Sequence, residues 1–345
     1  MKIVVTGGAG FLGLHLAKYL QKKGCSLILL DIAEFDKEEY KGFKTARCDV
    51  RDKKKLSEFV KGADIIIHAA AALPLWKDKD IYSTNINGTK NVLELAKKHQ
   101  IKRVIFISST AVYGVPKKHP IEEEDPRVGV GSYGKSKIAA EDLCLAAIKD
   151  GLQVTIIRPK TFVGTGRLGV FEILFDWIHD GKKIPVIGNG KNRYQLLDVD
   201  DLVEVVYLFC LRNHKSYNDT FNIGAEKFKT VREDLEKLFK FAKSGSQILQ
   251  TPPFLVKKAL WFFDKIGISP LYQWVYDTAD KDSFVSIDKL TNTLNWNPKY
   301  SNSEALIKSY DWYLKNYDEI KPKTSGVTHT VGWKQGILAL FKRFA

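Results

Sequence analysis

The 345-residue sequence predicts an α/β fold, a doubly wound parallel sheet with a smaller C-terminal substrate lobe. Three observations predict this class. Short β-branched runs alternate with helical patterns up to about residue 160. Most of these runs are apolar throughout, which is typical of strands buried on both faces. A glycine-rich loop joins the first strand to the first helix, as at the ligand-binding edge of such sheets.

The first half of the chain supplies the strands and helices of the sheet in regular order. The expected strands are Lys2–Thr6, Ser26–Leu30, Ile65–His68, Val104–Ser108 and Val154–Ile157. Helical patterns lie between them, over residues 11–23, 53–60, 84–99 and 134–150. Strand–helix alternation implies parallel pairing with right-handed crossovers. We therefore predict a Rossmann-type domain over residues 1–160.

The regular alternation fades after Pro159. Turns rich in glycine separate short apolar pieces there, and two more helices are expected near residues 200–212 and 230–243. We predict that residues 161–320 mainly form the substrate lobe, with segments that return to the first domain. Residues 321–345 contain cations and no acid, and we treat them as a basic amphipathic tail.

The composition restricts the class of ligand. A net charge of +14 suits an anionic ligand, but no nucleic-acid-binding motif accompanies the scattered lysines. We therefore expect a small-molecule substrate and no nucleic acid. Four widely spaced cysteines predict reduced, mostly buried thiols, with no disulfide frame and no metal site: Cys25, Cys48, Cys144 and Cys210. The chain shows no apolar run of membrane-spanning length and no signal-peptide pattern, so we expect a cytoplasmic protein.

Three glycines predict a dinucleotide site after the first strand. Gly7 permits a tight turn, Gly10 lets the backbone approach a pyrophosphate, and Gly13 allows close helix–strand packing. The helix that begins there presents free N–H groups to the phosphates. Asp31, at the end of the next strand, can accept hydrogen bonds from both hydroxyls of the adenosine ribose. Because its charge would repel a 2′-phosphate, we predict NAD rather than NADP.

A tyrosine and a lysine predict the catalytic chemistry. Tyr133 and Lys137 are four residues apart, one helical turn, on the same face. A tyrosine with a pKa near ~10 is a poor base at neutral pH. A nearby ammonium group and an oxidised nicotinamide would lower that pKa toward the working range. The pair therefore predicts hydride transfer between a substrate hydroxyl carbon and NAD.

Taken together, these motifs resemble those of extended short-chain dehydrogenases/reductases, in the NAD-dependent epimerase/dehydratase group, over roughly residues 1–230. The resemblance implies that Asp49 binds the adenine amino group and that Asn85 lies near the nicotinamide ribose. Lys137 would also bind ribose hydroxyls. The full set of cofactor contacts that it implies, beside the glycines and Asp31, is Phe11, Leu12, Asp49, Val50, Ala69, Ala70, Ala71, Asn85, Lys137 and Pro159.

The same resemblance completes the catalytic set. The segment from Ser108 to Gly114 is similar to the family's Ser-Ser-x-x-Val-Tyr-Gly element. By position, Ser109 is the catalytic hydroxyl beside Tyr133 and Lys137, and Ser108 is structural. Candidate substrate contacts are Trp76, Thr110, Thr161 and Arg193. The element that contains Arg193 departs from the family's Val-His-Val-Asp-Asp pattern, because Asp198 stands where histidine is usual.

We predict a nucleotide-sugar (UDP-sugar) 4-epimerase. Dehydratases of this group carry an acidic pair next to the catalytic hydroxyl, where this chain has Thr110 and Ala111. The alternative is an oxidoreductase that resembles 3β-hydroxysteroid dehydrogenases and acts on an apolar or lipid-linked alcohol. Three apolar segments favour it: Leu73–Trp76, Val170–Ile178 and Pro253–Tyr276. A non-catalytic NAD sensor is a third hypothesis, which the Ser/Tyr/Lys set opposes.

Two predictions concern partners. Residues 325–345 mix bulky apolar residues with cations, so as a helix they could contact a membrane surface. The segment could equally dock on its own protein or on a second subunit. Related enzymes pair through two helices next to the catalytic tyrosine, so the resemblance implies a homodimer through residues 84–99 and 134–150.

Overall fold

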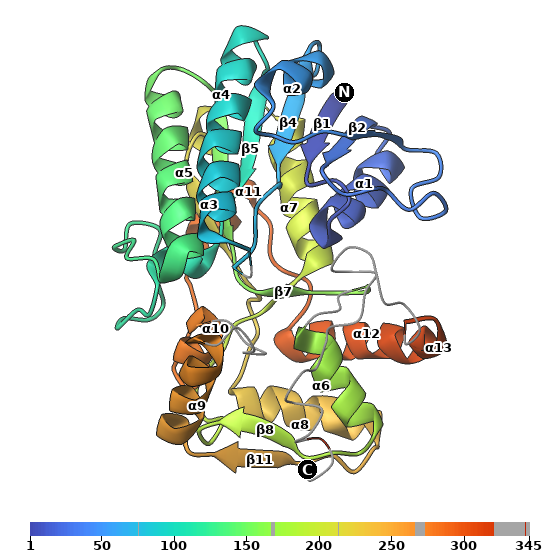
Figure 1. Cartoon of the computed structure of the whole chain (residues 1–345), viewed down its shortest axis with the longest axis vertical. Helices are drawn as coiled ribbons and strands as arrows, with labels where there is room; N and C mark the ends of the chain where they lie inside the picture. Colours follow the sequence, from blue (N-terminus) through green and yellow to red (C-terminus); the bar gives the residue numbers. More distant parts are fainter. Residues whose placement is uncertain (75, 167–169, 213, 266–272, 321–341, 343–345) are drawn as a thin grey trace.

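The computed structural model describes the chain except residues 75, 167–169, 213, 266–272, 321–341 and 343–345. It has two parts, a larger one around a parallel sheet and a smaller lobe below it (Figure 1). The larger part carries the predicted dinucleotide-binding loop. The smaller lobe closes the edge of the sheet at which that loop lies.

A seven-stranded sheet forms the centre of the larger part. Its order is β10-β6-β5-β4-β1-β2-β3, and every pair of neighbours is parallel. The strands are β1 (Lys2–Thr6), β2 (Ser26–Asp31), β3 (Lys44–Arg47), β4 (Ile65–His68), β5 (Arg103–Ile107), β6 (Val154–Pro159) and β10 (Thr220–Ile223). The five predicted strands are confirmed within two residues, whereas β3 and β10 were missed. The strand order reverses between β1 and β4, where such sheets bind their ligands.

Alternate residues of the strands pack into two cores on opposite faces of the sheet. Ile3 and Val5 join the core formed with α1 (Phe11–Lys22) and α7 (Val199–Leu211). Val4 joins the core formed with α2 (Lys53–Val60), α4 (Thr89–Lys98) and α5 (Gly131–Lys149). This two-sided burial explains why the central strands β1, β2 and β4 consist mostly of apolar residues. The doubly wound fold is confirmed.

Segments after residue 160 return to the larger part. Strand β10 pairs with β6 at the edge of the sheet, and α7 packs against α1. Helix α11 (Asp288–Leu294) contributes Leu290 to the core that α1 and α7 form with the sheet. Besides these, the larger part holds α3 (Asp78–Tyr82), the π-helical turn η1 (Ser83–Gly88) and two 3-10 turns, η2 (Thr110–Tyr113) and η3 (Lys215–Tyr217).

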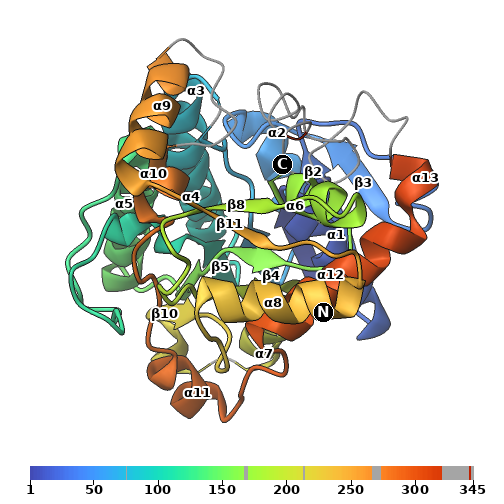
Figure 2. The ribbon, with the colours of Figure 1, turned by 90° about the horizontal axis from the view of Figure 1, so that it is seen from below.

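The smaller lobe has two short parallel strand pairs and its own core. Strand β8 (Ile184–Ile187) pairs with β11 (Ile248–Thr251), and β7 (Phe162–Val163) pairs with β9 (Leu197–Asp198). Seen from below, β8 and β11 lie next to α8 (Figure 2). The helices are α6 (Val170–His179), α8 (Val231–Ala242), α9 (Pro253–Lys265), α10 (Gln273–Thr278), α12 (Asn302–Lys315) and α13 (Tyr317–Ile320). Phe175, Leu238 and Tyr310 pack together in the core between α6, α8 and α12.

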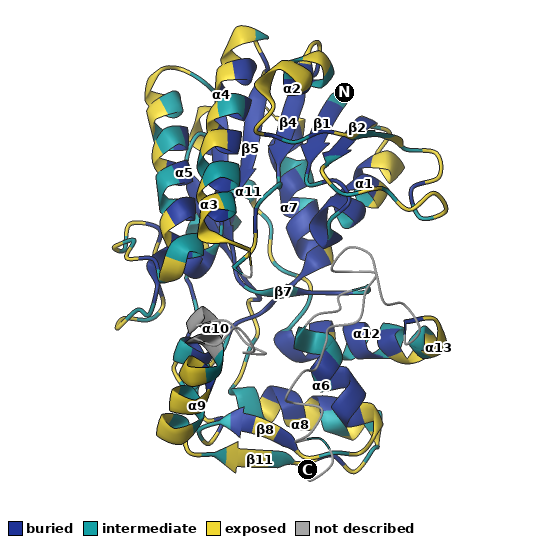
Figure 3. Cartoon of the chain, viewed as in Figure 1, coloured by how far each residue is buried: buried dark blue, intermediate teal, exposed yellow. Residues whose placement is uncertain are grey.

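The aromatic stretch at α9 lies on the surface. Phe254 is 74% exposed, Leu255 62% and Phe262 55%. Figure 3 shows exposed residues along this helix between partly buried ones, and Leu260 is buried, at 7%. The stretch Pro253–Tyr276 was one of three apolar segments that favoured an apolar alcohol as the substrate. For the described residues of α9, that interpretation is wrong.

Several smaller findings bear on the composition. All four cysteines are free, and three of them are buried. Within the part of the chain that the structure describes, no helix has both the length and the apolar character needed to cross a membrane.

Residues 325–345, the predicted membrane contact, lie outside the described residues except for Lys342. The ammonium group of Lys342 pairs with Asp176 of α6 and, at 2.8 Å, with Asp180.

Candidate active site

The glycine loop is held together by contacts that only glycine allows. Gly7 has a positive φ of 75°, and a Cβ there would lie 2.7 Å from Ala70 N. A Cβ on Gly13 would lie 2.2 Å from the carbonyl oxygen of Gly7. At Gly10, by contrast, the nearest atom would be 3.3 Å away. Gly7 and Gly13 therefore serve the packing of the loop, and Gly10 leaves space beside the backbone for a ligand.

The start of α1 is suited to a pyrophosphate. Gly10 is its N-cap and has no side chain that could accept a hydrogen bond from the first N–H groups of the helix. The side chains of Phe11 and Leu12 are buried, so only their backbone can face a phosphate. A helix N-terminus with free N–H groups and the positive end of the helix dipole attracts anions. The residues present therefore fit the phosphates of a dinucleotide.

This arrangement predicts the result of substituting Gly10→Ala. Gly10 has φ −79° and ψ 169°, which alanine adopts readily, and the Gly7 carbonyl oxygen at 3.3 Å from the new Cβ needs to shift only slightly. The free energy of unfolding should therefore fall by no more than ~1 kcal/mol. The added methyl group would occupy the space beside the backbone, so the Kd for NAD, measured by calorimetry, should rise at least ~10-fold. Gly13→Ala is the control and should lower the melting temperature, because its Cβ collides with backbone. Wild-type NAD affinity in Gly10→Ala would contradict this assignment.

Asp31 is the last residue of β2, and Asp49 lies two residues after the end of β3. Asp31 accepts hydrogen bonds from Ala9 N and Ala33 N, both at 3.0 Å, so its carboxylate is fixed beside the glycine loop. Asp49 accepts hydrogen bonds from the Arg51 guanidinium, the shortest at 2.7 Å. Burial alone would raise the pKa of Asp49, but these hydrogen bonds outweigh it and lower the pKa. The lowered pKa keeps the Asp49 carboxylate ionised at neutral pH.

A chain of buried polar groups connects the glycine loop to α5. His68 lies between the hydroxyls of Thr6 and Thr89, at 2.7 and 3.1 Å. Burial lowers the pKa of His68 to about 3, so its ring is neutral. Thr89 in turn donates to the backbone oxygen of Asn85. This chain fixes the end of β4, where the Ala69–Ala71 loop begins.

Asn85 holds the cofactor loop rather than presenting its amide to a cavity. The side chain accepts a hydrogen bond from Ala72 N at 2.8 Å and donates to Ser136 Oγ at 2.9 Å. It is 2% exposed. The neighbouring Gly88 lies against Val50, where a Cβ would be 2.6 Å from a Val50 methyl group. Direct contact of Asn85 with a nicotinamide ribose stays a prediction, and the structure gives Asn85 a positioning task.

The three predicted catalytic residues come from two neighbouring elements. Ser109 precedes η2, and its Oγ accepts a hydrogen bond from Ala111 N at 3.1 Å. Tyr133 and Lys137 lie one turn apart at the start of α5. Lys137 is buried, donates to the Ile107 carbonyl oxygen at 2.7 Å, and lies 4.6 Å from the centre of the Phe106 ring. Burial lowers the pKa of Lys137 to about 8, against the opposing effect of Glu141.

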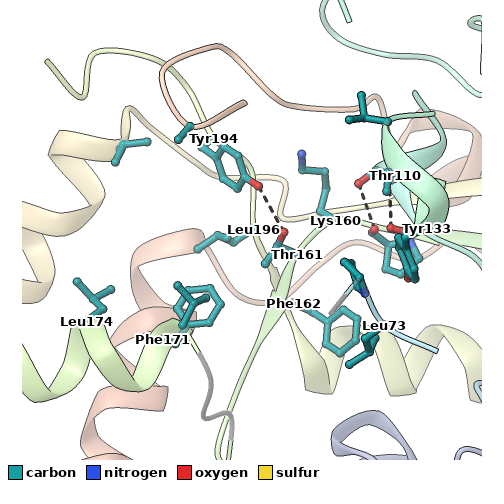
Figure 4. Close-up of a pocket in the computed structure, with 18 of the residues that line it drawn as sticks. Leu73, Thr110, Tyr133, Lys160, Thr161, Phe162, Phe171, Leu174, Tyr194 and Leu196 are labelled. Atoms are coloured by element: carbon teal, nitrogen blue, oxygen red, sulfur yellow. Dashed lines mark hydrogen bonds between the residues drawn. The ribbon is translucent and has the colours of Figure 1, made fainter. Parts of the chain in front are cut away.

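A cavity of about 690 Å³ lies between the two parts of the molecule. Ser109 and Pro159 are in its wall. Thr110, Tyr133 and Thr161 line it as well (Figure 4). Thr110 donates a hydrogen bond to the Pro159 carbonyl oxygen at 3.3 Å. The fold therefore brings five of the predicted residues together from η2, α5 and the end of β6. Within the described residues, no three His, Cys, Asp or Glu side chains are placed to hold a metal ion.

Two of the predicted substrate contacts do not line this cavity. Arg193 is on the surface, where its guanidinium lies 4.8 Å and 4.5 Å from the ring centres of Phe228 and Phe284. Trp76 is 43% exposed, although the nearby Leu73 lies in the cavity wall. The position of Arg193 depends on two aromatic rings that are distant in the sequence. The local motif around Arg193 gives no information about those rings.

Several residues of the cavity wall are not among the predicted substrate contacts. They come chiefly from the smaller lobe and from the segment that leads into it: Lys160, Phe162, Tyr194 and Leu196. Phe171 and Leu174 also line the wall, and they belong to the apolar segment Val170–Ile178 that favoured the alternative function. Lys160 carried a usable signal, because a lysine directly after a predicted central strand lies where the ligand edge of the sheet begins. The aromatic and aliphatic residues carried none, since they look like ordinary core.

A buried ion pair lies behind the segment that carries the predicted catalytic residues Ser109 and Tyr133. Arg158 donates two hydrogen bonds to Glu141, at 2.9 and 2.7 Å, and a third to the Tyr113 hydroxyl at 2.6 Å. Ser108 donates to the same carboxylate at 2.6 Å. The predicted structural role of Ser108 thus agrees with its contacts. The network joins β5, η2, α5 and β6, the elements that carry Ser109 and Tyr133.

Comparison with known families tests the predicted resemblance. The sequence pattern of the NAD dependent epimerase/dehydratase family matches residues 3–224. The chain belongs to this family. Membership confirms the predicted enzyme class and the predicted cofactor, NAD.

Similar proteins agree with this membership. The "Uncharacterized protein y4nG" of Sinorhizobium fredii is 34% identical and aligns over 98% of this chain and 84% of its own length. A UDP-N-acetyl-alpha-D-glucosaminuronate decarboxylase of Bacillus cytotoxicus is 30% identical, over 90% and 97%. The solved UDP-glucose 4-epimerase of Thermotoga maritima has a TM-score of 0.77 at 23% identity, covering 92% of this chain and 100% of its own. At that identity, the solved structure supports the fold alone.

Proposed function

We propose that this enzyme is a nucleotide-sugar 4-epimerase that transfers a hydride transiently to NAD. One observation carries the proposal. Ser109 and Tyr133 share the wall of one cavity, Lys137 is buried one turn behind Tyr133, and no acid stands at positions 110 and 111. The first two features supply the groups needed to oxidise a carbon that bears a hydroxyl group. Because of the third feature, elimination of water would lack the acidic pair that dehydratases of this family carry.

Each catalytic residue has a task that follows from its contacts. Tyr133 accepts the proton of the substrate hydroxyl. Ser109 accepts a hydrogen bond from Ala111 N, so its own hydroxyl hydrogen is available to the substrate oxygen. Lys137, with its pKa at about 8, is mostly an ammonium at neutral pH and favours the phenolate form of Tyr133. NAD, when bound, supplies the ring that takes the hydride and returns it.

The names of similar proteins support a nucleotide sugar as the substrate class. They include a putative UDP-glucose 4-epimerase of Methanocaldococcus jannaschii, 28% identical, and a UDP-glucose 4-epimerase of Halalkalibacterium halodurans, 26% identical. A dTDP-glucose 4,6-dehydratase of Streptomyces niveus is also similar, at 26%. Thr110 and Ala111 favour the epimerase among these reactions. The cytoplasmic location, the homodimer through the helices at 84–99 and 134–150, and the membrane contact stay predictions.

One observation favours the alternative, an oxidoreductase acting on an apolar alcohol. The cavity wall includes the apolar side chains of Leu73, Phe171 and Leu174 (Figure 4). A steroid-like ring system could pack against them. The exposed α9 removes one of the three segments that supported this reading, so we rank it second.

Incubation with NAD and a panel of substrates distinguishes the two functions. The panel holds UDP-glucose, UDP-N-acetylglucosamine, UDP-glucuronate and a 3β-hydroxysteroid. We expect a 4-epimer of at least one nucleotide sugar, detected by nuclear magnetic resonance, with no lasting absorbance from NADH. Stoichiometric NADH with the steroid, and no epimer, would overturn the proposal in favour of the alternative. Each assay is paired with the Tyr133→Phe variant as its control.

A further inference from the structure

A buried lysine lines the cavity without an acidic partner. Lys160 is 1% exposed and belongs to the cavity wall, where Figure 4 shows it with Tyr194. Its Nζ donates a hydrogen bond to Ser283 Oγ at 2.7 Å and lies 4.8 Å from the centre of the Tyr194 ring. Throughout the described chain, no carboxylate forms an ion pair with this ammonium.

An ammonium group in this position is unfavourable when it stands alone. Burial without a counter-charge lowers the pKa of Lys160 to about 7. The other titratable groups nearby do not supply the missing charge. His119 is neutral or positive, and its pKa is lowered by burial and by Lys160, while Asp282 acts on His119 in the opposite direction. Burial raises the pKa of Tyr194, so its phenol is neutral. A bound anion from outside the chain would supply the negative charge that the Lys160 ammonium group lacks.

The position of Lys160 indicates which part of the substrate it meets. The preceding residue, Pro159, accepts a hydrogen bond from Thr110, which directly follows the catalytic Ser109. The sugar carbon that is oxidised must lie at Ser109 and Tyr133. Lys160 is therefore near the sugar end of a nucleotide sugar, rather than near the base. The anionic group most consistent with that position is carried by the sugar.

We propose that Lys160 binds a carboxylate on the sugar ring, so that the preferred substrate is a nucleotide uronate. The proposal rests on the proposed function and narrows its substrate class. An ammonium with two N–H groups not donated to any described residue can give both to a carboxylate. Hydrogen bonds between two charged groups are about twice as strong as neutral ones, which gives selectivity over a sugar with a neutral hydroxymethyl group.

Binding measurements test the proposal without turnover. The host is the NAD-loaded Tyr133→Phe protein, and the ligands are UDP-glucuronate, UDP-glucose and UDP. We expect UDP-glucuronate to bind at least ~10-fold more tightly than UDP-glucose. Adding Lys160→Met should weaken UDP-glucuronate by ~10- to 100-fold and leave the other two within ~3-fold. The matched control is Lys183→Met, which removes an exposed cation directly before β8 and should change the binding of none of the three ligands.

Proton uptake provides a second readout. At pH 8 most Lys160 side chains in the free protein are neutral, since the pKa is at about 7. A bound carboxylate raises that pKa, so binding should take up close to one proton, and affinity for the uronate should fall as pH rises above 7. Calorimetry in two buffers of different ionisation enthalpy measures this uptake. Lys160→Met should lose it, and should melt no lower than its host, because an unpaired buried charge has been removed.

Three outcomes would overturn the proposal. Equal weakening of all three ligands in Lys160→Met would show that Lys160 meets the diphosphate. Unchanged binding of UDP-glucuronate would show that it meets no anion. If none of the three ligands binds the NAD-loaded protein with Tyr133 intact, the proposed function itself fails, which is distinct from a failure of the uronate preference alone.

Discussion

The Tyr133→Phe variant should lose turnover by about 10²- to 10⁴-fold while binding NAD with unchanged affinity. The substitution removes one oxygen atom from the cavity wall and leaves the ring, so the fold should be unaffected. The phenol is the group that takes the substrate proton. The carboxylate one turn beyond Lys137, that of Glu141, already accepts hydrogen bonds from Ser108 and Arg158, so it does not replace the phenol. Turnover is measured as epimer formation, and NAD affinity by calorimetry.

The matched control for this variant is Tyr113→Phe. Tyr113 is also buried near the site, but its hydroxyl donates to Asn222 and accepts from Arg158. Its loss should lower stability by ~1–3 kcal/mol and change turnover far less. Substantial turnover in Tyr133→Phe would remove the phenol from the mechanism and, with it, the assignment of Lys137.

Lys137 adds a pH dependence to the same experiment. Its ammonium group favours the phenolate, so Lys137→Met should move the acid limb of the pH–rate profile to higher pH. In the intact enzyme, activity should also decline as pH rises well above 8, where Lys137 loses its proton. An acid limb at the same pH in both proteins would contradict the electrostatic role of Lys137.

Breaking the buried ion pair should produce the largest loss of stability. Glu141→Gln or Arg158→Met should each lower the free energy of unfolding by ~3–5 kcal/mol, because each leaves a charge buried without its partner. The side chains of Arg158 and Glu141 are 3% and 0% exposed, so solvent screens neither. Urea denaturation followed by circular dichroism measures the change.

The double variant provides the control for this prediction. Glu141→Leu combined with Arg158→Met leaves no isolated charge of the pair, so it should be more stable than either single variant. Single variants within ~1 kcal/mol of the wild type would contradict the view that this network supports Ser108 and η2. Since Arg127 also contacts Glu141, at 3.2 Å, the loss in Arg158→Met should be the smaller of the two if Arg127 takes over part of the contact.

Long apolar strands and the glycine loop could be predicted from the sequence because their signals are local. Strand β3 was missed, since Lys44–Arg47 is a short edge strand with half-exposed and exposed residues and no apolar run. Strand β10 was missed because Thr220–Ile223 pairs with a strand more than sixty residues earlier. The helix predicted over residues 134–150 begins earlier, at Gly131. A glycine inside a glycine-rich turn seldom indicates the start of a helix.

The residues of the site also fall into two groups, those that local motifs predict and those that meet only through contacts between distant segments. Ser109, Tyr133 and the glycines follow motifs in which chemistry and spacing occur together in a few residues. Lys160 and Tyr194 meet only because β6 and the segment before β9 converge on the cavity. Arg193 was placed by analogy with a motif, and two aromatic rings from elsewhere in the chain determine where it lies.

The most direct test of the mechanism is a crystal structure with bound NAD. We expect the pyrophosphate at the N-terminus of α1, beside Gly10, and the nicotinamide ring facing the cavity wall formed by Ser109 and Tyr133. The phenol oxygen and the ring should leave room for one sugar carbon between them. A nicotinamide ring directed away from Tyr133, with the phenol facing only protein, would contradict the account.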